Sequence, residues 1–168
     1  MRIRSVISLD TAKMLFNTIV MPHFDYCSIL WGTAEDTYLM AVRLQKRAAR
    51  IILKAPKFSR SSNLFKMLDW LPLKLRIEYH RAVLVYKALN GLAPAYLCSK
   101  FQAIVGNYNT RASKIKNFRV PKPKLEKYRS SFAYTGAVLW NSIPVNMRNA
   151  GTLDKFKELF LNYIRESR

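Results

Sequence analysis

The segment from Pro72 to Gly91 constrains the fold more than any other, because it combines clear helix boundaries with apolar residues on most sides. Pro72 occupies an N1-like position, and Asn90 with Gly91 supplies the left-handed stop typical of a helix C-terminus. A helix that is apolar around most of its circumference must be packed on several sides. We therefore predict a mainly α protein with this helix at its centre. Its apolar residues are Leu73, Leu75, Ile77, Tyr79, Ala82, Val83, Leu84, Val85, Tyr86 and Leu89.

Capping residues and apolar residues at helical spacing predict the other helices. Ser8 or Asp10 caps a first helix that runs to about Val20. Pro22 is expected to interrupt this helix, and a second short helix ends at Gly32. Further helices are expected over residues 35–53, through residue 68, over residues 94–101 and over residues 130–141.

The composition of the chain changes from Gly106 to Arg129, where most residues are polar or basic. Pro121 and Pro123 forbid a helix there, so an extended basic arm or a small β-hairpin is expected. Thr152 then caps a C-terminal amphipathic helix. The apolar stripe of that helix is Leu153, Phe156, Leu159, Phe160 and Tyr163.

The expected organisation has three parts. Residues 1–105 form a helical bundle, residues 106–129 a basic Pro/Lys-rich arm, and residues 130–168 a C-terminal helical segment that packs back on the bundle. A chain of 168 residues with 50% hydrophobic residues is long enough and apolar enough for such a packed core.

The helix expected from Glu35 to Leu53 has two different faces. Its predicted apolar face consists of Ala41, Leu44, Ala48, Ile51 and Ile52. The opposite face carries a narrow basic stripe of Arg43, Arg47, Arg50 and Lys54. These cations extend over about 16 Å, a length that suits contacts to a phosphate backbone. We therefore predict that this stripe binds nucleic acid.

The net charge also favours a polyanionic partner. The sequence contains 29 Lys and Arg against 10 Asp and Glu, a formal net charge of +19 at pH 7. Residues 43–66 and 111–129 are two basic blocks, and Glu126 is the one acid within them. The second block supplies the cations expected to form a mobile second clamp: Lys114, Lys116, Arg119, Lys122 and Lys124.

Aromatic residues interleave with the second basic block at Tyr108, Phe118 and Tyr128. They either stack on nucleic-acid bases or pin the arm to the core. The second interpretation is favoured.

No set of side chains predicts catalysis or metal binding. A two-metal polymerase or nuclease site requires carboxylates that converge on ions about 4 Å apart. His23 and His80 belong to no metal-binding or catalytic pattern, and the glycines form no phosphate-binding loop. We expect no catalytic residue, no metal and no cofactor. The acids are widely separated, at Asp10, Asp25, Asp69 and Asp154, apart from the helix-capping pair Glu35 and Asp36.

The sequence predicts a soluble intracellular protein, with nuclear and cytoplasmic locations both open. No apolar stretch approaches the roughly 20 residues of a bilayer span, and no signal-peptide core follows Met1 to Arg4. Cys27 and Cys98 are expected to be reduced thiols. No membrane partner is expected.

Four strings are more specific than the composition: LFNTIVMPHFDYCSILWG, RLQKRAARIILKAP, LDWLPLKLRIEYHRAVLVYKALNGLAPAYL and SFAYTGAVLWNSIP. They occupy residues 15–32, 43–56, 68–97 and 131–144. In this order they resemble the region that follows the catalytic palm in reverse transcriptases of jockey-like non-LTR (LINE-type) retrotransposons. Further similarities are Thr110-Arg111, the VPKPK string at residues 120–124 and Phe156 in the closing helix.

The resemblance implies a thumb and post-thumb region that grips template and primer while a palm domain catalyses polymerisation. The palm of such enzymes carries an aromatic-x-Asp-Asp motif, and this chain contains no Asp-Asp pair. We therefore expect a truncated C-terminal fragment of an RNA-directed DNA polymerase that is not itself an enzyme. Its expected partners are an RNA–DNA hybrid or RNA, bound without sequence specificity, and the missing palm domain.

Three alternatives remain open at this stage. The chain is a stand-alone element-derived RNA- or DNA-binding protein, or one stretch of a longer active reverse transcriptase. A third possibility is a protein-interaction module in which Trp31, Trp70 and Trp140 seal an interface toward the palm.

Overall fold

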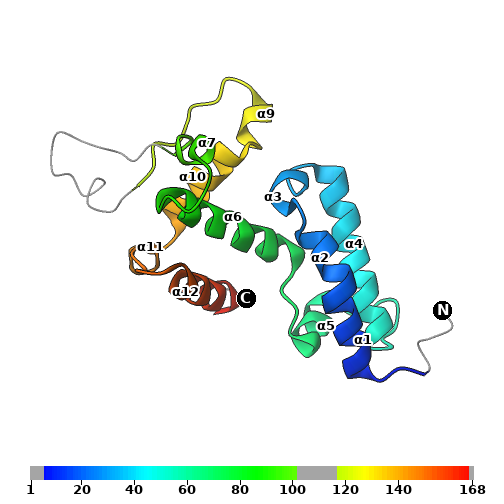
Figure 1. The fold of residues 1–168 in the computed structure, drawn as a ribbon. Helices are drawn as coiled ribbons and strands as arrows, with labels where there is room; N and C mark the ends of the chain where they lie inside the picture. Colours follow the sequence, from blue (N-terminus) through cyan, green and yellow to red (C-terminus); the bar gives the residue numbers. More distant parts are fainter. Residues whose placement is uncertain (1–5, 102–116, 167–168) are drawn as a thin grey trace, which may run out of the picture. The chain divides into compact units, whose positions relative to one another are not determined.

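The computed structural model describes residues 6–101 and 117–166 of the chain (Figure 1). Every regular element in these two ranges is a helix, which confirms the mainly α fold. The elements are α1 (Leu9–Leu15), the π-helix η1 (Phe16–Val20), α2 (Met21–Asp25), α3 (Ser28–Trp31), α4 (Glu35–Ile52), α5 (Ser61–Leu68), α6 (Leu73–Leu89), α7 (Ala95–Cys98), α9 (Glu126–Arg129), α10 (Phe132–Ser142), α11 (Val145–Arg148) and α12 (Leu153–Glu166).

The chain divides into two compact units. Unit 1 comprises residues 1–77 and unit 2 comprises residues 78–168, so α6 contributes residues to both. The predicted organisation into residues 1–105, 106–129 and 130–168 stays a prediction.

The helix α6 has the boundaries that its sequence predicts. It begins at Leu73, directly after Pro72, and ends before Gly91. Gly91 has a φ of 69°, and the N–H of Leu92 donates to the carbonyl of Lys87 at 2.8 Å. This left-handed ending confirms the predicted stop. The buried residues of α6 are Leu73, Ile77, Ala82, Val85, Tyr86 and Ala88.

Residues 9–25 form one helical run through α1, η1 and α2. Ser8 caps its start, because its Oγ accepts a hydrogen bond from the N–H of Thr11 at 3.2 Å. The prediction that Pro22 interrupts the helix is wrong, since α2 continues through it. The run widens into η1 just before Pro22, and the N–H of Met21 donates to the carbonyl of Phe16. This wider turn accommodates a proline that has no N–H to donate.

The first turn of α6 is held to the end of the α2–α3 segment within unit 1. Arg76 donates from Nε and Nη2 to the two carboxylate oxygens of Asp25 at 2.5 and 2.6 Å. Both side chains are half-buried, which strengthens a paired geometry of this kind. Close by, a Cβ on Gly32 would lie 2.5 Å from the carbonyl oxygen of Ser28 and 2.8 Å from Cδ1 of Ile77. Only glycine fits at this position.

A core of apolar side chains joins the helices of unit 1. The rings of Phe16 and Trp70 stack with centroids 4.2 Å apart. Ala41, Leu73 and Ile77 form a second buried cluster where α4 meets α6. The other buried members of the main cluster are Met21, Ala49, Leu64, Phe65 and Leu68.

The buried line of α4 runs along Ala41, Gln45 and Ala49. Leu44 is 48% exposed, so the prediction of this residue on the buried face is wrong. The buried line lies about one residue further along the helix than the apolar residues alone indicate. It contains a polar side chain, because the rest of the protein supplies hydrogen-bond partners for it.

The amide of Gln45 satisfies two backbone groups at the entrance to α6. Its Nε2 donates to the carbonyl of Leu71 at 3.0 Å, and its Oε1 accepts from the N–H of Leu73 at 3.0 Å. The second bond satisfies one of the four N–H groups that the start of a helix leaves unpaired. Gln45 is 1% exposed and its bond to the N–H of Leu73 is buried, so that N–H has no water as a substitute partner.

A series of aromatic contacts forms the core of unit 2. Tyr86 of α6 stacks on Phe156 of α12 with ring centroids 4.5 Å apart. Trp140 of α10 lies with its centroid 5.9 Å from Phe156 and 5.9 Å from Phe118. The hydroxyl of Tyr86 donates to the carbonyl of Ala150 at 2.7 Å. These contacts tie α6, α10 and α12 together within the unit.

The burial of the tryptophans bears on the protein-interaction alternative. Trp70 is 3% exposed and Trp140 is 2% exposed, so both are core residues of this chain. Their assignment to an interface toward a palm domain is wrong. Trp31 is half-buried, and its Nε1 donates to the carbonyl of Tyr26 at 2.8 Å.

Residues 117 and 118 are fastened to unit 2. Asn141 accepts from the N–H of Phe118 at 2.9 Å and donates to its carbonyl at 3.0 Å. Arg148 donates from Nη1 to Oδ1 of Asn117 at 2.7 Å. Phe118 is buried and therefore pins this segment to the core, as predicted. The last part of the predicted arm differs from the prediction, because Glu126–Arg129 form α9.

The amide of Gln45 generates a prediction about stability. We expect Gln45→Leu to lower the free energy of unfolding by about 2–4 kcal/mol, because the buried N–H of Leu73 and the part-buried carbonyl of Leu71 lose their partners. The matched control is Leu44→Ala on the same helix, which should cost less than about 1 kcal/mol because Leu44 is largely exposed. Urea denaturation measures both. Equal stability of Gln45→Leu and the wild type would contradict the role of this amide.

Candidate nucleic-acid interface

Arg43 and Arg47 extend from the side of α4 that faces away from the buried residues. Both side chains are exposed, one helical turn apart. The buried line of Ala41, Gln45 and Ala49 lies on the opposite side of the helix. The structure therefore places these two predicted contacts where a phosphate backbone has access to them.

Arg50 continues the stripe but is less accessible than predicted. Its side chain is half-buried, and its Nε atom is buried with no hydrogen-bond partner among the described residues. Burying a charged group without a partner has a cost in free energy. Its remaining guanidinium nitrogens provide fewer donors to an external anion than those of Arg43 and Arg47 do.

Lys54 lies just beyond the end of α4, in the left-handed conformation with a φ of 51°. The N–H of Lys54 donates to the carbonyl of Ile51 at 3.3 Å, and the N–H of Ala55 donates to that of Arg50 at 2.9 Å. This pair of bonds is the Schellman motif, in which glycine is the usual residue at the Lys54 position. Lys54 is exposed, so the helix ending presents a cation.

No carboxylate neutralises the stripe within residues 6–101 and 117–166. Asp25 pairs with Arg76, Glu126 with Arg129 and Asp154 with Lys157, all outside the stripe. From Thr37 to Leu68 the sequence contains no acid at all. The outward side of α4 therefore has an uncompensated positive charge, which attracts polyanions.

Further exposed cations follow the predicted stripe along the chain. Lys57 and Arg60 in the α4–α5 loop and Lys66 on α5 are exposed. Phe58 lies between the first two and is also exposed. Phe58 is not among the predicted contacts, although an aromatic residue inside the first basic block is a sequence signal for a nucleic-acid contact.

The cations of the predicted second clamp divide into two groups. Arg119, Lys122 and Lys124 are exposed and follow directly after the buried Phe118. Lys114 and Lys116 lie outside the described residues, as does Tyr108. Tyr128 is 44% exposed.

Two other arginines are structural. Burial lowers the pKa of Arg81, an effect that the charge of Glu78 partly offsets. Burial also lowers the pKa of Arg148, which bonds to Asn117. Arg148 is buried and Arg81 is half-buried, so their guanidinium groups are less accessible to a phosphate backbone than those of Arg43 and Arg47.

The described residues contain no candidate metal site. Residues 6–101 and 117–166 contain no group of three His, Cys, Asp or Glu side chains suited to hold a metal ion. Cys27 and Cys98 are free thiols. No helix in these ranges is both long enough and apolar enough to cross a bilayer.

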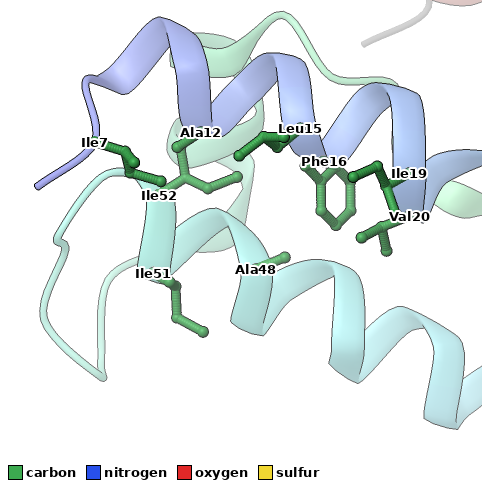
Figure 2. Close-up of a pocket in the computed structure, with 9 residues that line it drawn as sticks. All are labelled: Ile7, Ala12, Leu15, Phe16, Ile19, Val20, Ala48, Ile51 and Ile52. Carbon is green, nitrogen blue, oxygen red and sulfur yellow. The ribbon is translucent and has the colours of Figure 1, made fainter. Parts of the chain in front are cut away.

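An apolar groove lies between α1 with η1 and the end of α4, within unit 1. Figure 2 shows the side chains of its lining, and its volume is about 320 Å³. No charged or hydrogen-bonding side chain lines it, so the groove is unsuited to phosphate and lies outside the candidate interface. The lining residues are Ile7, Ala12, Leu15, Phe16, Ile19, Val20, Ala48, Ile51 and Ile52.

In comparisons with known proteins, no family model, no curated protein and no solved structure matches the chain. The resemblance to the region after the reverse transcriptase palm therefore stays an expectation from the sequence.

The backbone of Lys54 generates a prediction that separates stability from charge. We expect Lys54→Gly to be about 1 kcal/mol more stable than Lys54→Gln, because glycine adopts the left-handed conformation without steric cost. Both variants remove the same charge and should bind nucleic acid equally weakly. Thermal unfolding and a binding titration measure the two effects. A more stable Gln variant would contradict the assigned helix ending.

Proposed function

We propose that this chain is a nucleic-acid-gripping region of a jockey-like non-LTR retrotransposon reverse transcriptase, corresponding to the thumb and post-thumb. The observation that supports this most is the uncompensated basic stripe on α4, with Arg43 and Arg47 exposed opposite the core. The order of the four sequence strings supports the proposed family, and the basic stripe supports the proposed nucleic-acid binding.

In this proposal the stripe binds the phosphates of a template–primer duplex. Guanidinium groups one helical turn apart contact successive phosphates, and such contacts position a duplex without reading its sequence. An RNA–DNA hybrid or RNA is the proposed ligand, recognised by its shape and its 2′-hydroxyl groups. Arg119, Lys122 and Lys124 supply further phosphate contacts from the basic arm, as do Lys114 and Lys116.

The chain itself does not polymerise nucleotides under this proposal. The 168 residues contain no Asp-Asp pair for the two metal ions of a polymerase. Chemistry would come from a palm domain, which we propose as the protein partner. The basic arm and the C-terminal segment of residues 130–168 belong to the same proposed architecture.

Two related interpretations share the gripping surface and differ in what surrounds it. A stand-alone element-derived binding protein would use the stripe by itself, whereas a longer active reverse transcriptase would use it beside its palm. Sequencing the transcript upstream of Met1 distinguishes them. An open frame that continues through an aromatic-x-Asp-Asp motif supports the longer enzyme, and an in-frame stop codon supports the stand-alone protein.

Charge reversal on α4 tests the proposed function. We expect the double variant Arg43→Glu, Arg47→Glu to bind an RNA–DNA hybrid more weakly, to a similar extent for all sequences. The slope of log K against log salt should become shallower by roughly 0.7 to 0.9 for each phosphate that the variant no longer neutralises. Fluorescence anisotropy over a series of salt concentrations measures the slope.

A matched control distinguishes a contact surface from net charge. The double variant Lys74→Glu, Lys100→Glu changes the net charge by the same amount at two exposed positions outside the basic blocks. Its salt slope should remain close to that of the wild type. If the two double variants changed the affinity and the salt slope equally, net charge alone would explain the binding, and the proposal would be contradicted.

A further inference from the structure

Phe58 is an exposed aromatic side chain inside the first basic block. It is 91% exposed, although a phenylalanine of this size normally contributes to a core. A single exposed apolar residue needs no special explanation by itself. The surroundings of Phe58 make it different, because the cations Lys54, Lys57 and Arg60 lie within four residues of it and are all exposed.

The backbone holds Phe58 at the tip of a tight turn. The N–H of Ser59 donates to the carbonyl of Pro56 at 3.1 Å, which places Lys57 and Phe58 at the two central positions of a β-turn. The chain packs against the core just before this turn, at Ala55, and again at Leu64 of α5. Phe58 is therefore presented outward by a hydrogen-bonded segment with packed residues on both sides.

The ring has a positively charged environment. Nζ of Lys57 lies 6.0 Å from the centroid of the Phe58 ring. No acid occurs between Thr37 and Leu68, so nothing in this stretch of sequence offsets the charge around the ring. An apolar pocket on a protein partner could cover a ring, but it would leave these cations without counterions. A ligand that combines flat apolar faces with phosphates satisfies both.

We propose that Phe58 is a stacking platform for an unpaired nucleotide base, with the flanking cations binding the adjacent phosphates. This inference rests on the proposed function and specifies the form of the ligand. Every base has a π-face on which an aromatic ring can stack, so the contact tolerates any sequence. Within a duplex the neighbouring bases cover those faces, and the platform thus selects a single-stranded stretch next to the gripped duplex.

The test compares Phe58→Leu with the wild type on a single-stranded RNA and on a long duplex of the same sequence. Removing one base–aromatic stack should weaken single-strand binding by about 5- to 100-fold. Binding to the long duplex should change less than about twofold, and the salt slope should stay the same because the substitution removes no charge. Phe58→Trp keeps an aromatic ring at this position and should therefore bind the single strand about as tightly as the wild type does. Thermal unfolding verifies that each variant is folded.

The outcomes separate this inference from the proposed function. Unchanged single-strand binding in Phe58→Leu, or an equal loss on both ligands, overturns the stacking platform. Single-strand binding by Phe58→Trp that is as weak as that of Phe58→Leu also overturns it. If the stripe variants weaken duplex binding while Phe58→Leu has no effect, only the inference about Phe58 fails. If the wild type binds neither ligand, the proposed function fails with it.

Discussion

The hydrogen bonds of the Gln45 side chain are the constraint on which the rest of unit 1 depends. They fix the rotation of α4 about its own axis, because the amide must meet the backbone of Leu71 and Leu73 at the entrance to α6. With Gln45 held inward, Arg43 and Arg47 have to lie on the outer side. The same amide thus determines the core contacts of α4 and the position of its positive charge.

Much of the fold could be predicted from local signals in the sequence. The left-handed stop at Gly91 and a cap at Ser8 or Asp10 follow from neighbouring residues alone, and the structure has the stop at Gly91 and the cap at Ser8. The rotation of α4 about its axis could not be predicted locally, because the hydrogen-bond partners that allow Gln45 to be buried lie 26 and 28 residues away in the sequence. Periodicity ranks Leu44 above glutamine as a core residue. The passage through Pro22 was missed for a similar reason, since a π-turn has no simple signature in sequence.

The candidate site was predictable in its charge and less so in its detail. The spacing of Arg43 and Arg47 was sufficient to place them on an exposed face. The burial of the Arg50 Nε atom depends on tertiary packing, and the left-handed backbone of Lys54 depends on where α4 ends. Phe58 was not predicted because an aromatic residue belongs to the core by default. Its exposure follows from a turn that holds it away from the packed residues.

The order in which the parts of unit 1 are synthesised affects when the unit can fold. Its core requires Leu73 and Ile77, and its ion pair joins Asp25 to Arg76, so the unit closes with residues that are translated last. The helices made earlier carry an apolar surface that has no complete partner until the first turn of α6 leaves the ribosome. During that interval the incompletely covered apolar surface is open to premature association, so unit 1 is most vulnerable just before residues 73–77 are in place.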